Sequence, residues 1–334
     1  MQSKHSIEKQ TAHYVDCFTT VSEITNNECR ELLDKPADVV LMNGFEDDFV
    51  PKGATFTGKR KRARSTMLRV ANCLLGEDLG DDTLIIGTSG RYEFKNKGID
   101  VFLESLNRLN RDKDLKKKVL AFVNVPSWVG DPREDLQKRL KSKDKFTEPL
   151  QCPFITHWLH NMTHDQVLDM LKYLGMGNRP EDKVKVIFVP CYQDGHDGIL
   201  NKHYYDLILG EDLSVYPSYY EPWGYTPLES VAFRVPTITT DLAGFGLWVN
   251  SLKNQHGIND GVEVLHRSDY NYSEVADGIK DTVALFSTKT EAEIKEIRKR
   301  AGQVAEQALW KHFIQYYYEA YDIALRNAMK RQLK

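Results

Sequence analysis

The sequence has no long apolar run and no cysteine pattern suited to disulfides. No stretch of its 334 residues approaches the ~20 apolar positions that a membrane-spanning helix needs. Residues 1–6 also lack the apolar core of a secretory signal. The cysteines are odd in number and scattered, at Cys17, Cys29, Cys73, Cys152 and Cys191. We therefore expect a cytoplasmic chain with reduced thiols and no membrane contact.

The composition also lacks an excess of charge of either sign. Its 45 basic and 48 acidic residues give a net charge of -3, which provides no general attraction to nucleic acid or anionic lipid. Hydrophobic residues make up 41% and charged residues 28%, the balance of a globular protein rather than a disordered one. The length suits one large domain or two ordinary ones.

Short runs rich in Val and Ile alternate with segments of helical spacing along most of the chain. The runs are not strictly alternating in polarity, as is usual for buried parallel strands, and they lie at 39–42, 83–87, 118–123, 184–189, 213–216 and 236–240. Helical spacing is found at 99–109, 165–174, 272–286 and, as one or two long helices, 290–334. This alternation predicts a Rossmann-like α/β fold with a doubly wound parallel sheet and ligands at the carboxyl ends of its strands. The charged, irregular region 127–153 is expected to be a surface insertion.

The most informative segment, residues 217–229, follows an expected strand and carries two carboxylates, Glu221 and Glu229, around a turn rich in Pro and Gly. Its end predicts a capping box, with Thr226 as N-cap, Pro227 at the first helical position and Glu229 at the third. A helix start has unpaired N–H groups and a partial positive charge, which suit a phosphate. We therefore expect a sugar-nucleotide site here.

This segment resembles the glycogen synthases, UDP-glucose-dependent glycosyltransferases with the two-domain GT-B architecture. Residues 219–227 (YYEPWGYTP) read as the family motif, and residues 90–98 (GRYEFKNKG) resemble a second signature. A weaker third match covers 16–25 with Asn43 and Gly44 behind it. The resemblance implies a retaining transfer of glucose from UDP-glucose to the non-reducing end of an α-1,4-glucan such as glycogen. It also implies that no metal or other cofactor is needed.

The resemblance assigns catalytic roles to three side chains. Arg91 and Lys97, which would otherwise be read as solvated surface cations, would contact the donor diphosphate and offset the charge on the departing UDP. Glu221 would orient or stabilise the donor glucose near its anomeric carbon. Glu229 would bind the ribose hydroxyls of the nucleotide.

Further donor contacts are expected from the turn and from a tyrosine pair. The backbone N–H groups of Gly224, Tyr225 and Thr226 are candidates for phosphate contacts at the helix start. Either Tyr204 or Tyr205 would stack on the uracil, and the sequence leaves the choice open.

The chain has room for only one of the two domains of such an enzyme. Residues 1–40 look like the last helix and strand of the N-terminal GT-B domain, and residues 41–310 like the Rossmann-like donor domain. Residues 311–334 fit the C-terminal helix that would pack back on the N-terminal domain. We therefore expect a donor-binding portion that is inactive without that missing domain, and a homo-oligomer is left open.

Two other functions also stay open. One is a GT-B transferase with another donor such as ADP-glucose, and the other is a non-catalytic fragment that binds nucleotide or glucan. The family's eukaryotic members carry an arginine cluster that binds glucose 6-phosphate near the C-terminus. The matching residues 291–300 mix acids with bases, which puts activation by sugar phosphate in doubt.

Several motifs favour less specific interpretations. Residues 53–60 nearly spell a P-loop, but Arg60 stands where Ser or Thr would hold magnesium. The basic run 59–64 predicts the solvated face of a helix whose apolar side is Met67, Val70 and Leu74.

Two further motifs are ambiguous. Cys152, His157, His160 and His164 invite a zinc interpretation, but no paired-ligand pattern completes the set. Residues 241–246 resemble the family's glycine-bearing loop beside the donor, or form a turn that needs a positive φ.

Overall fold

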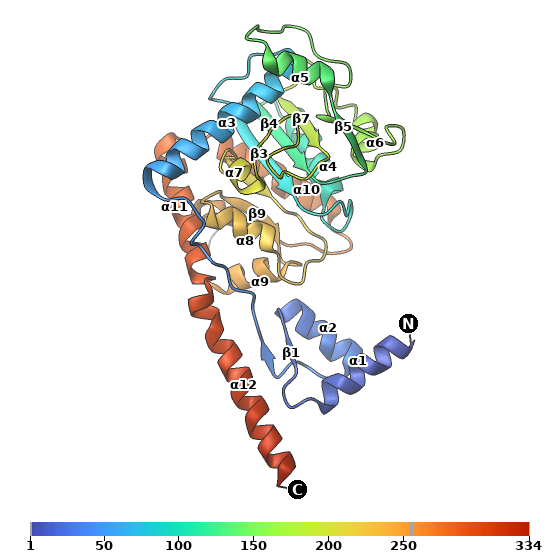
Figure 1. The fold of residues 1–334 in the computed structure, drawn as a ribbon, viewed down its shortest axis with the longest axis vertical. Coiled ribbons are helices and arrows are strands. Elements are labelled where there is room, and N and C mark those ends of the chain that lie inside the picture. Colours follow the sequence, from blue (N-terminus) through green and yellow to red (C-terminus); the bar gives the residue numbers. More distant parts are fainter. Residues whose placement is uncertain (1, 254–256, 334) are drawn as a thin grey trace.

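A six-stranded parallel sheet forms the centre of the molecule in the computed structural model, which describes residues 2–253 and 257–333 (Figure 1). The strand order is β10-β9-β8-β3-β4-β7, and every neighbouring pair is parallel. The strands are β3 Leu84–Ser89, β4 Val119–Asn124, β7 Val184–Val189, β8 Leu213–Val215, β9 Thr237–Thr240 and β10 Val262–Leu265. The predicted doubly wound sheet is confirmed. Its sixth strand, β10, was not predicted, because this edge strand is short, half-buried and contains a glutamate.

Helices cover both faces of the sheet, because alternate side chains of the buried strands point to opposite sides. On one face, α4 Ile99–Asn110, α6 Gln166–Tyr173 and α10 Tyr272–Ser287 pack into one apolar cluster with β3, β4 and β7. On the other face, α3 Gly53–Leu75 and α7 Tyr204–Ile208 pack against the same strands. A third cluster joins α8 Tyr225–Ala232, α9 Gly244–Ser251 and α11 Glu291–Gln307 near β9 and β10. A short 3-10 helix, Ile258–Asp260, precedes β10.

The chain ends form a separate arm below the sheet (Figure 1). Helices α1 Gln2–Tyr14 and α2 Glu23–Leu33 flank a two-stranded parallel sheet of β1 Thr19–Thr20 and β2 Val39–Val40. The last helix, α12 Trp310–Gln332, runs down beside them, and its Asn327 and Arg331 contact Asp16 at 2.8 Å. Both long C-terminal helices are confirmed, whereas the predicted domain boundaries stay predictions.

The region 127–153 is more than a surface insertion. It contains β5 Val129–Pro132, which pairs antiparallel with β6 His157–Leu159, and α5 Glu134–Lys141. Leu136 of α5 is fully buried against α3, and Arg133 is fully buried as well. The sequence pattern did not predict these buried positions, because most residues around them are charged.

The basic run on α3 is only partly the predicted solvated face, because Lys61 and Arg62 are exposed whereas Arg60 and Arg64 are half-buried. Met67, Val70 and Leu74 are buried as predicted, but Arg60 and Arg64 each form an ion pair of 2.6 Å with Asp212. The same carboxylate accepts the backbone N–H of Ile85 at 2.9 Å. The run therefore fastens α3 to the amino-terminal edge of the sheet.

The described residues include no helix that is long and apolar enough to span a membrane. All five cysteines are free thiols.

Glu211 is an unusual carboxyl group next to Asp212. It is buried against Gly87 of β3, where any Cβ would overlap its carboxylate, and it accepts a hydrogen bond of 2.6 Å from the hydroxyl of Ser214. Burial is the main reason why its pKa is raised from 4.5 to about 8.

We predict that Glu211→Gln removes a pH-dependent loss of stability. The folded state keeps a proton that the unfolded state releases, so stability falls as the pH rises from 4.5 to about 8 and the loss is complete above that range. Thermal denaturation at about pH 9 should show a melting temperature a few degrees higher in the variant, with little change at about pH 5. The exposed Glu134→Gln serves as control. An equal shift at both pH values would contradict the assignment.

Candidate functional site

Three loops meet at the carboxyl-terminal edge of the sheet. Residues 90–98 connect β3 to α4, residues 216–224 connect β8 to α8, and residues 241–243 connect β9 to α9. Because the strands are parallel and β3, β8 and β9 are neighbours, all three loops lie on one side, where ligands bind in folds of this type.

The first two loops contact each other at Gly98, where there is no room for a side chain. Gly98, the N-cap of α4, has a φ of 68°, and a Cβ there would overlap the carbonyl oxygen of Pro217. The Tyr219 N–H donates to the Asn96 carbonyl at 2.8 Å. The buried guanidinium of Arg267 donates to the same Pro217 carbonyl at 2.5 Å. The two loops therefore have a fixed relative position.

This contact brings two predicted catalytic residues together. The Nζ of Lys97 forms a short ion pair with Oε2 of Glu221, and the two side chains are only 15% and 18% exposed. The backbone of Glu221 is held from the third loop, since its N–H donates to Leu242 and its carbonyl accepts from Gly244, both at 3.0 Å. Lys97 and Glu221 thus form a preorganised, nearly desolvated charge pair.

Gly244 and Gly246 are needed for close packing against neighbouring backbone and not for a left-handed backbone conformation. Neither has a positive φ, so the alternative interpretation of this loop as a positive-φ turn is wrong. A Cβ on Gly244 would overlap the carbonyl of Pro222, and one on Gly246 would overlap that of Thr240. The close approach of the third loop is what supports Glu221.

Arg91 lies apart from the charge pair. Its side chain is 74% exposed and forms an ion pair of 2.9 Å with Glu93. It lines a cavity of about 360 Å³, to which the ends of β3, β4 and β7 and two helix starts contribute: Ser89, Gly90, Arg91, Tyr92, Asn124, Pro126, Cys191, Tyr192, Gln193, Tyr204 and Thr226. The cavity is of the size in which small ligands bind.

The two tyrosines have different positions. Tyr204 lines the cavity, and its hydroxyl lies 3.1 Å from that of Ser89. Tyr205 instead stacks on Phe233, with ring centres 5.2 Å apart, and its hydroxyl donates to Glu229 at 2.8 Å. Of the pair, only Tyr204 is therefore placed to meet a ligand in the cavity.

The predicted capping box is wrong. Helix α8 begins two residues earlier, with Gly224 as N-cap at a φ of 106°, Tyr225 and Thr226 as its first residues, and no side-chain cap. Glycine allows the chain to turn directly after the buried Trp223, and a proline in the first turn loses no hydrogen bond there. Glu229 falls in the second turn and is free to bind Tyr205. Burial raises the pKa of the Glu229 carboxyl.

A second hydrogen bond connects the Glu221 loop to the terminal arm. The hydroxyl of Tyr220, next to Glu221, donates to the carboxylate of Glu28 on α2 at 2.6 Å. The pKa of the Tyr220 hydroxyl is raised, mainly because the group is buried and also because it is hydrogen-bonded to the Glu28 carboxylate.

The zinc set proposed from the sequence does not assemble. His157 instead lies with Cys191 and Asp197, whose ligand atoms are within 4.8 Å of one another. The Nε2 of His157 is already hydrogen-bonded to the Asp197 carbonyl at 2.7 Å, and the Asp197 carboxylate accepts backbone N–H groups, including that of Leu200 at 2.8 Å. These bonds satisfy the groups as a structural cluster.

The P-loop interpretation is also excluded, because residues 53–60 are the first turns of α3 rather than a loop after a strand.

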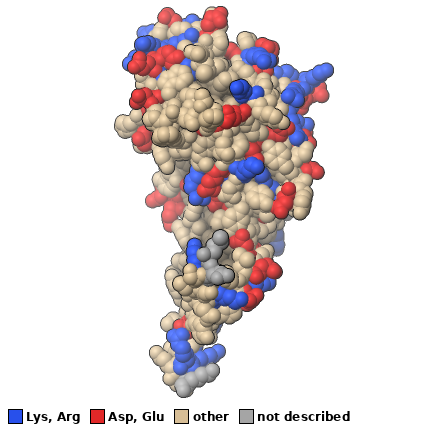
Figure 2. Space-filling model, turned by 90° about the vertical axis from the view of Figure 1, so that its right-hand side faces the viewer, with Lys and Arg blue, Asp and Glu red and all other residues tan. Residues whose placement is uncertain are grey.

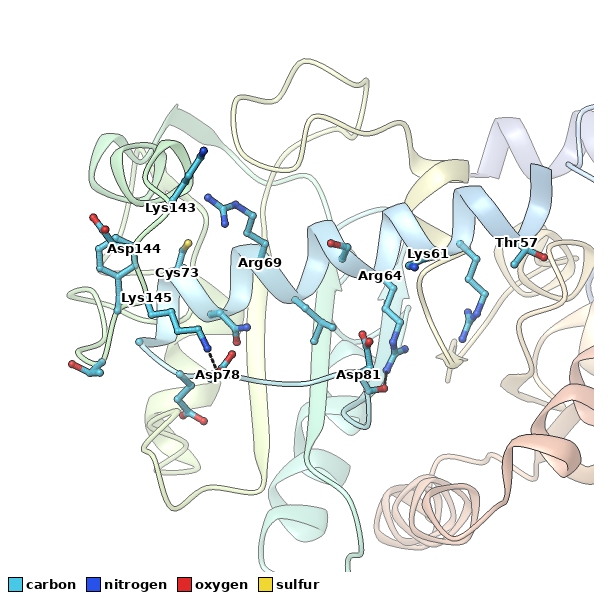
Figure 3. A pocket seen from close by; sticks show the side chains of 18 residues that line it. Thr57, Lys61, Arg64, Arg69, Cys73, Asp78, Asp81, Lys143, Asp144 and Lys145 are labelled. Carbon is cyan, nitrogen blue, oxygen red and sulfur yellow. Dashed lines mark hydrogen bonds and ion pairs between the residues drawn. The ribbon is translucent and has the colours of Figure 1, made fainter. Parts of the chain in front are cut away.

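A larger hollow lies elsewhere. A groove of about 980 Å³ runs along α3 toward Lys143, Asp144 and Lys145 (Figure 3). Lys145 and Asp78 pair across it at 2.6 Å. The groove follows the helix that leads into the amino end of β3, so it is remote from the three loops at the carboxyl edge.

Sequence reasoning missed the cavity residues outside the motifs. Ser89, Asn124 and Gln193 line it, and each follows or ends a buried strand. The rule that ligands bind at the carboxyl ends of parallel strands could have selected all three.

Comparisons with known proteins identify the family and the fold. A family model described as glycogen synthase matches residues 1–139 and 130–334. The glycogen [starch] synthase of Neurospora crassa is 28% identical over 387 residues, covering 97% of this chain and 54% of that protein. The chain spans about half the length of the curated relatives it matches.

Solved structures show the same fold. The catalytic domain of starch synthase IV from Arabidopsis thaliana, bound to ADP and acarbose, has a TM-score of 0.58 at 12% identity, covering 95% of this chain and 57% of that one. The Anabaena protein HepE, in complex with UDP and glucose, has a TM-score of 0.54 at 16% identity, covering 96% and 66%. These likenesses show the fold of GT-B glycosyltransferases.

We predict that Gly98→Ala destabilises the protein more than Gly175→Ala. The two glycines have nearly the same φ, 68° and 69°, so both variants carry a left-handed strain of about 1–2 kcal/mol. Only at Gly98 does the new Cβ also meet a carbonyl, since nothing lies within 4 Å of that position at Gly175. Urea denaturation measures both losses. Equal losses would show that the loop contact is not tight.

Proposed function

Because the chain belongs to the glycogen synthase family, we propose that it binds UDP-glucose and is the donor-binding portion of a retaining glucosyltransferase. The enzyme would extend the non-reducing end of an α-1,4-glucan. One observation carries the proposal: the Lys97–Glu221 pair and the cavity that Arg91 borders both lie at the carboxyl-terminal, ligand-binding edge of the same parallel sheet.

The chemistry requires positive charge at the leaving group. The bond between the anomeric carbon and the UDP oxygen breaks, the glucan hydroxyl oxygen bonds to that carbon on the same face, and the hydroxyl proton leaves for the departing phosphate. UDP gains negative charge in this step. Arg91, Lys97 and the N–H groups at the start of α8, those of Tyr225 and Thr226, would stabilise it, and no metal is required in this scheme.

Glu221 would act on the sugar rather than on the nucleotide. The transition state of glycosyl transfer resembles an oxocarbenium ion, whose positive charge a nearby carboxylate stabilises. Lys97 offsets the charge of Glu221 in the structure. A diphosphate that recruits the ammonium group would leave the carboxylate more negative where the sugar binds.

The nucleotide would lie against the other side of the cavity. Tyr204, which lines the cavity, would stack on the base, and Glu229, which accepts a hydrogen bond from Tyr205, would bind the ribose hydroxyls. Gly224 allows the backbone to approach the diphosphate because it has no side chain. These roles follow from the positions of the groups and from the family resemblance.

Two alternatives remain distinct from this proposal. The donor could be ADP-glucose, since the similar folds named above are bound to ADP in one case and to UDP in the other. The chain could also bind nucleotide or glucan without turnover. For catalysis we propose that it needs the other GT-B domain, docked on the terminal arm, in a cytoplasmic enzyme.

We predict that the chain binds UDP more tightly than ADP and that Arg91→Ala weakens UDP binding tenfold or more. A hydrogen bond to a charged group contributes about 1.5–3 kcal/mol, and about 1.4 kcal/mol is tenfold in affinity. Isothermal titration calorimetry with both nucleotides measures this.

Arg111→Ala, an exposed arginine at the end of α4, is the control for this titration. Preference for ADP would favour the ADP-glucose alternative. Binding that survives in Arg91→Ala would sink the proposed diphosphate contact.

We also predict that Glu229→Gln and Arg91→Ala separate nucleoside from phosphate recognition. Glu229→Gln should weaken uridine and UDP about equally, because the ribose is common to both. Arg91→Ala should weaken UDP and leave uridine unchanged. The same titrations give the four ratios, and a Glu229 variant that loses UDP but not uridine binding would contradict the ribose contact.

A further inference from the structure

Three exposed rings lie on one face of the β5–β6 ribbon. Along β6 and the following residue, His157 and Leu159 are buried while Trp158 and His160 are exposed, as expected for side chains that alternate between two faces. Trp128 joins this face from the opposite strand, because its carbonyl accepts the N–H of His160 at 3.1 Å and its ring lies 4.9 Å from the imidazole. Trp128 is 72% and Trp158 is 36% exposed.

Trp158 is held from below by a buried arginine. The guanidinium carbon of Arg133 lies 4.5 Å from the centre of the Trp158 ring, and Arg133 itself is fully buried. Its nitrogens donate to the carbonyls of Gln151 at 2.7 Å and Cys152 at 2.8 Å, and to the Asp135 carboxylate at 2.7 Å. Rings that are already ordered lose little entropy when a ligand binds.

The row continues from the wall of the cavity. Pro126 and Tyr192 both line the cavity, and Tyr192 is 76% exposed. The Ser127 N–H donates to the Pro190 carbonyl at 2.9 Å, which joins the loops that carry these residues. Trp128 follows Ser127 directly. The exposed ring of Tyr192 at the cavity and that of Trp128 on the ribbon therefore belong to two loops that are joined by a hydrogen bond.

The charge of this surface fits a neutral ligand. The cation under Trp158 is buried and paired with Asp135, so it offers no free positive charge. On the side of the molecule where β5 and α6 lie in Figure 1, acidic and basic residues are interspersed and neutral residues cover most of the face (Figure 2). Single-stranded nucleic acid also stacks on aromatic rings, but it requires a positively charged groove.

We propose that Trp128, Trp158 and His160 form a second α-glucan-binding surface, which holds the acceptor chain beside the donor cavity. A pyranose ring has a flat face of C–H groups that packs on an indole, while its hydroxyls remain in water at the edge. Side chains two residues apart on a strand are about 7 Å apart, so the row can contact successive sugars of one chain. This proposal rests on the proposed function, because an α-glucan is its acceptor.

The test is calorimetric titration of the full chain with maltoheptaose. We expect the variant Trp128→Ala/Trp158→Ala to bind at least tenfold more weakly and Trp158→Phe to keep most of the affinity. Tyr270→Ala, which removes a fully solvated ring elsewhere, should bind as the parent does. UDP titration and circular dichroism of each variant show that the donor cavity and the fold are intact.

The outcomes separate this proposal from the donor assignment. Maltoheptaose binding that the double variant retains, or UDP binding without any maltoheptaose binding, overturns the second surface and leaves the donor site standing. Tighter binding of an oligothymidylate than of maltoheptaose overturns it as well. If the parent chain binds no UDP but binds maltoheptaose, and the double variant loses the maltoheptaose binding, the result supports the second surface and refutes the donor site.

Discussion

Gly98 packs so closely against the carbonyl of Pro217 that no Cβ would fit between them, and the geometry of the site depends on this contact. Gly98 begins α4 and Pro217 begins the turn toward α8, so their approach sets the distance between two loops from neighbouring strands. Lys97 then meets Glu221 because each is a few residues from the point of contact. A buried arginine, Arg267, donates to the same carbonyl and fixes its position. Backbone packing, rather than attraction between the charges, places the pair.

The two edges of the sheet use charge differently. At the amino edge, Asp212 is neutralised by two arginines of α3, and the buried Arg298 donates to the Glu211 carbonyl at 3.2 Å. Those cations have protein partners and support the fold. At the carboxyl edge Arg91 extends into solvent beside the cavity. The size of a hollow is therefore a poor guide here, since the larger of the two lies along α3 and the smaller one lies at the edge where the loops meet.

Sequence patterns predicted the parts of the structure that local chemistry determines. Five of the six central strands and the long helices follow from apolar periodicity, and the motif residues reach one edge because they follow strands. The start of α8 was misplaced because the sequence offers two starts in the same turn, a glycine that can adopt a positive φ and a Thr-Pro-x-Glu cap, and the structure uses the glycine directly after the buried Trp223. The pairing of Arg60 with Asp212 spans 152 positions, so no local pattern contains it. The choice between Tyr204 and Tyr205 likewise depended on which ring Phe233 covers.

The hydrogen bond from Tyr220 to Glu28 joins residues 192 positions apart and has a mechanical consequence. Glu221 is held on one side by the third loop and is bonded along the chain to a residue anchored on α2. Any rotation of the terminal arm against the sheet must therefore break this bond or drag the turn with it. While that bond holds, the angle of the arm and the position of the turn that carries Glu221 are coupled, because Tyr220 directly precedes Glu221.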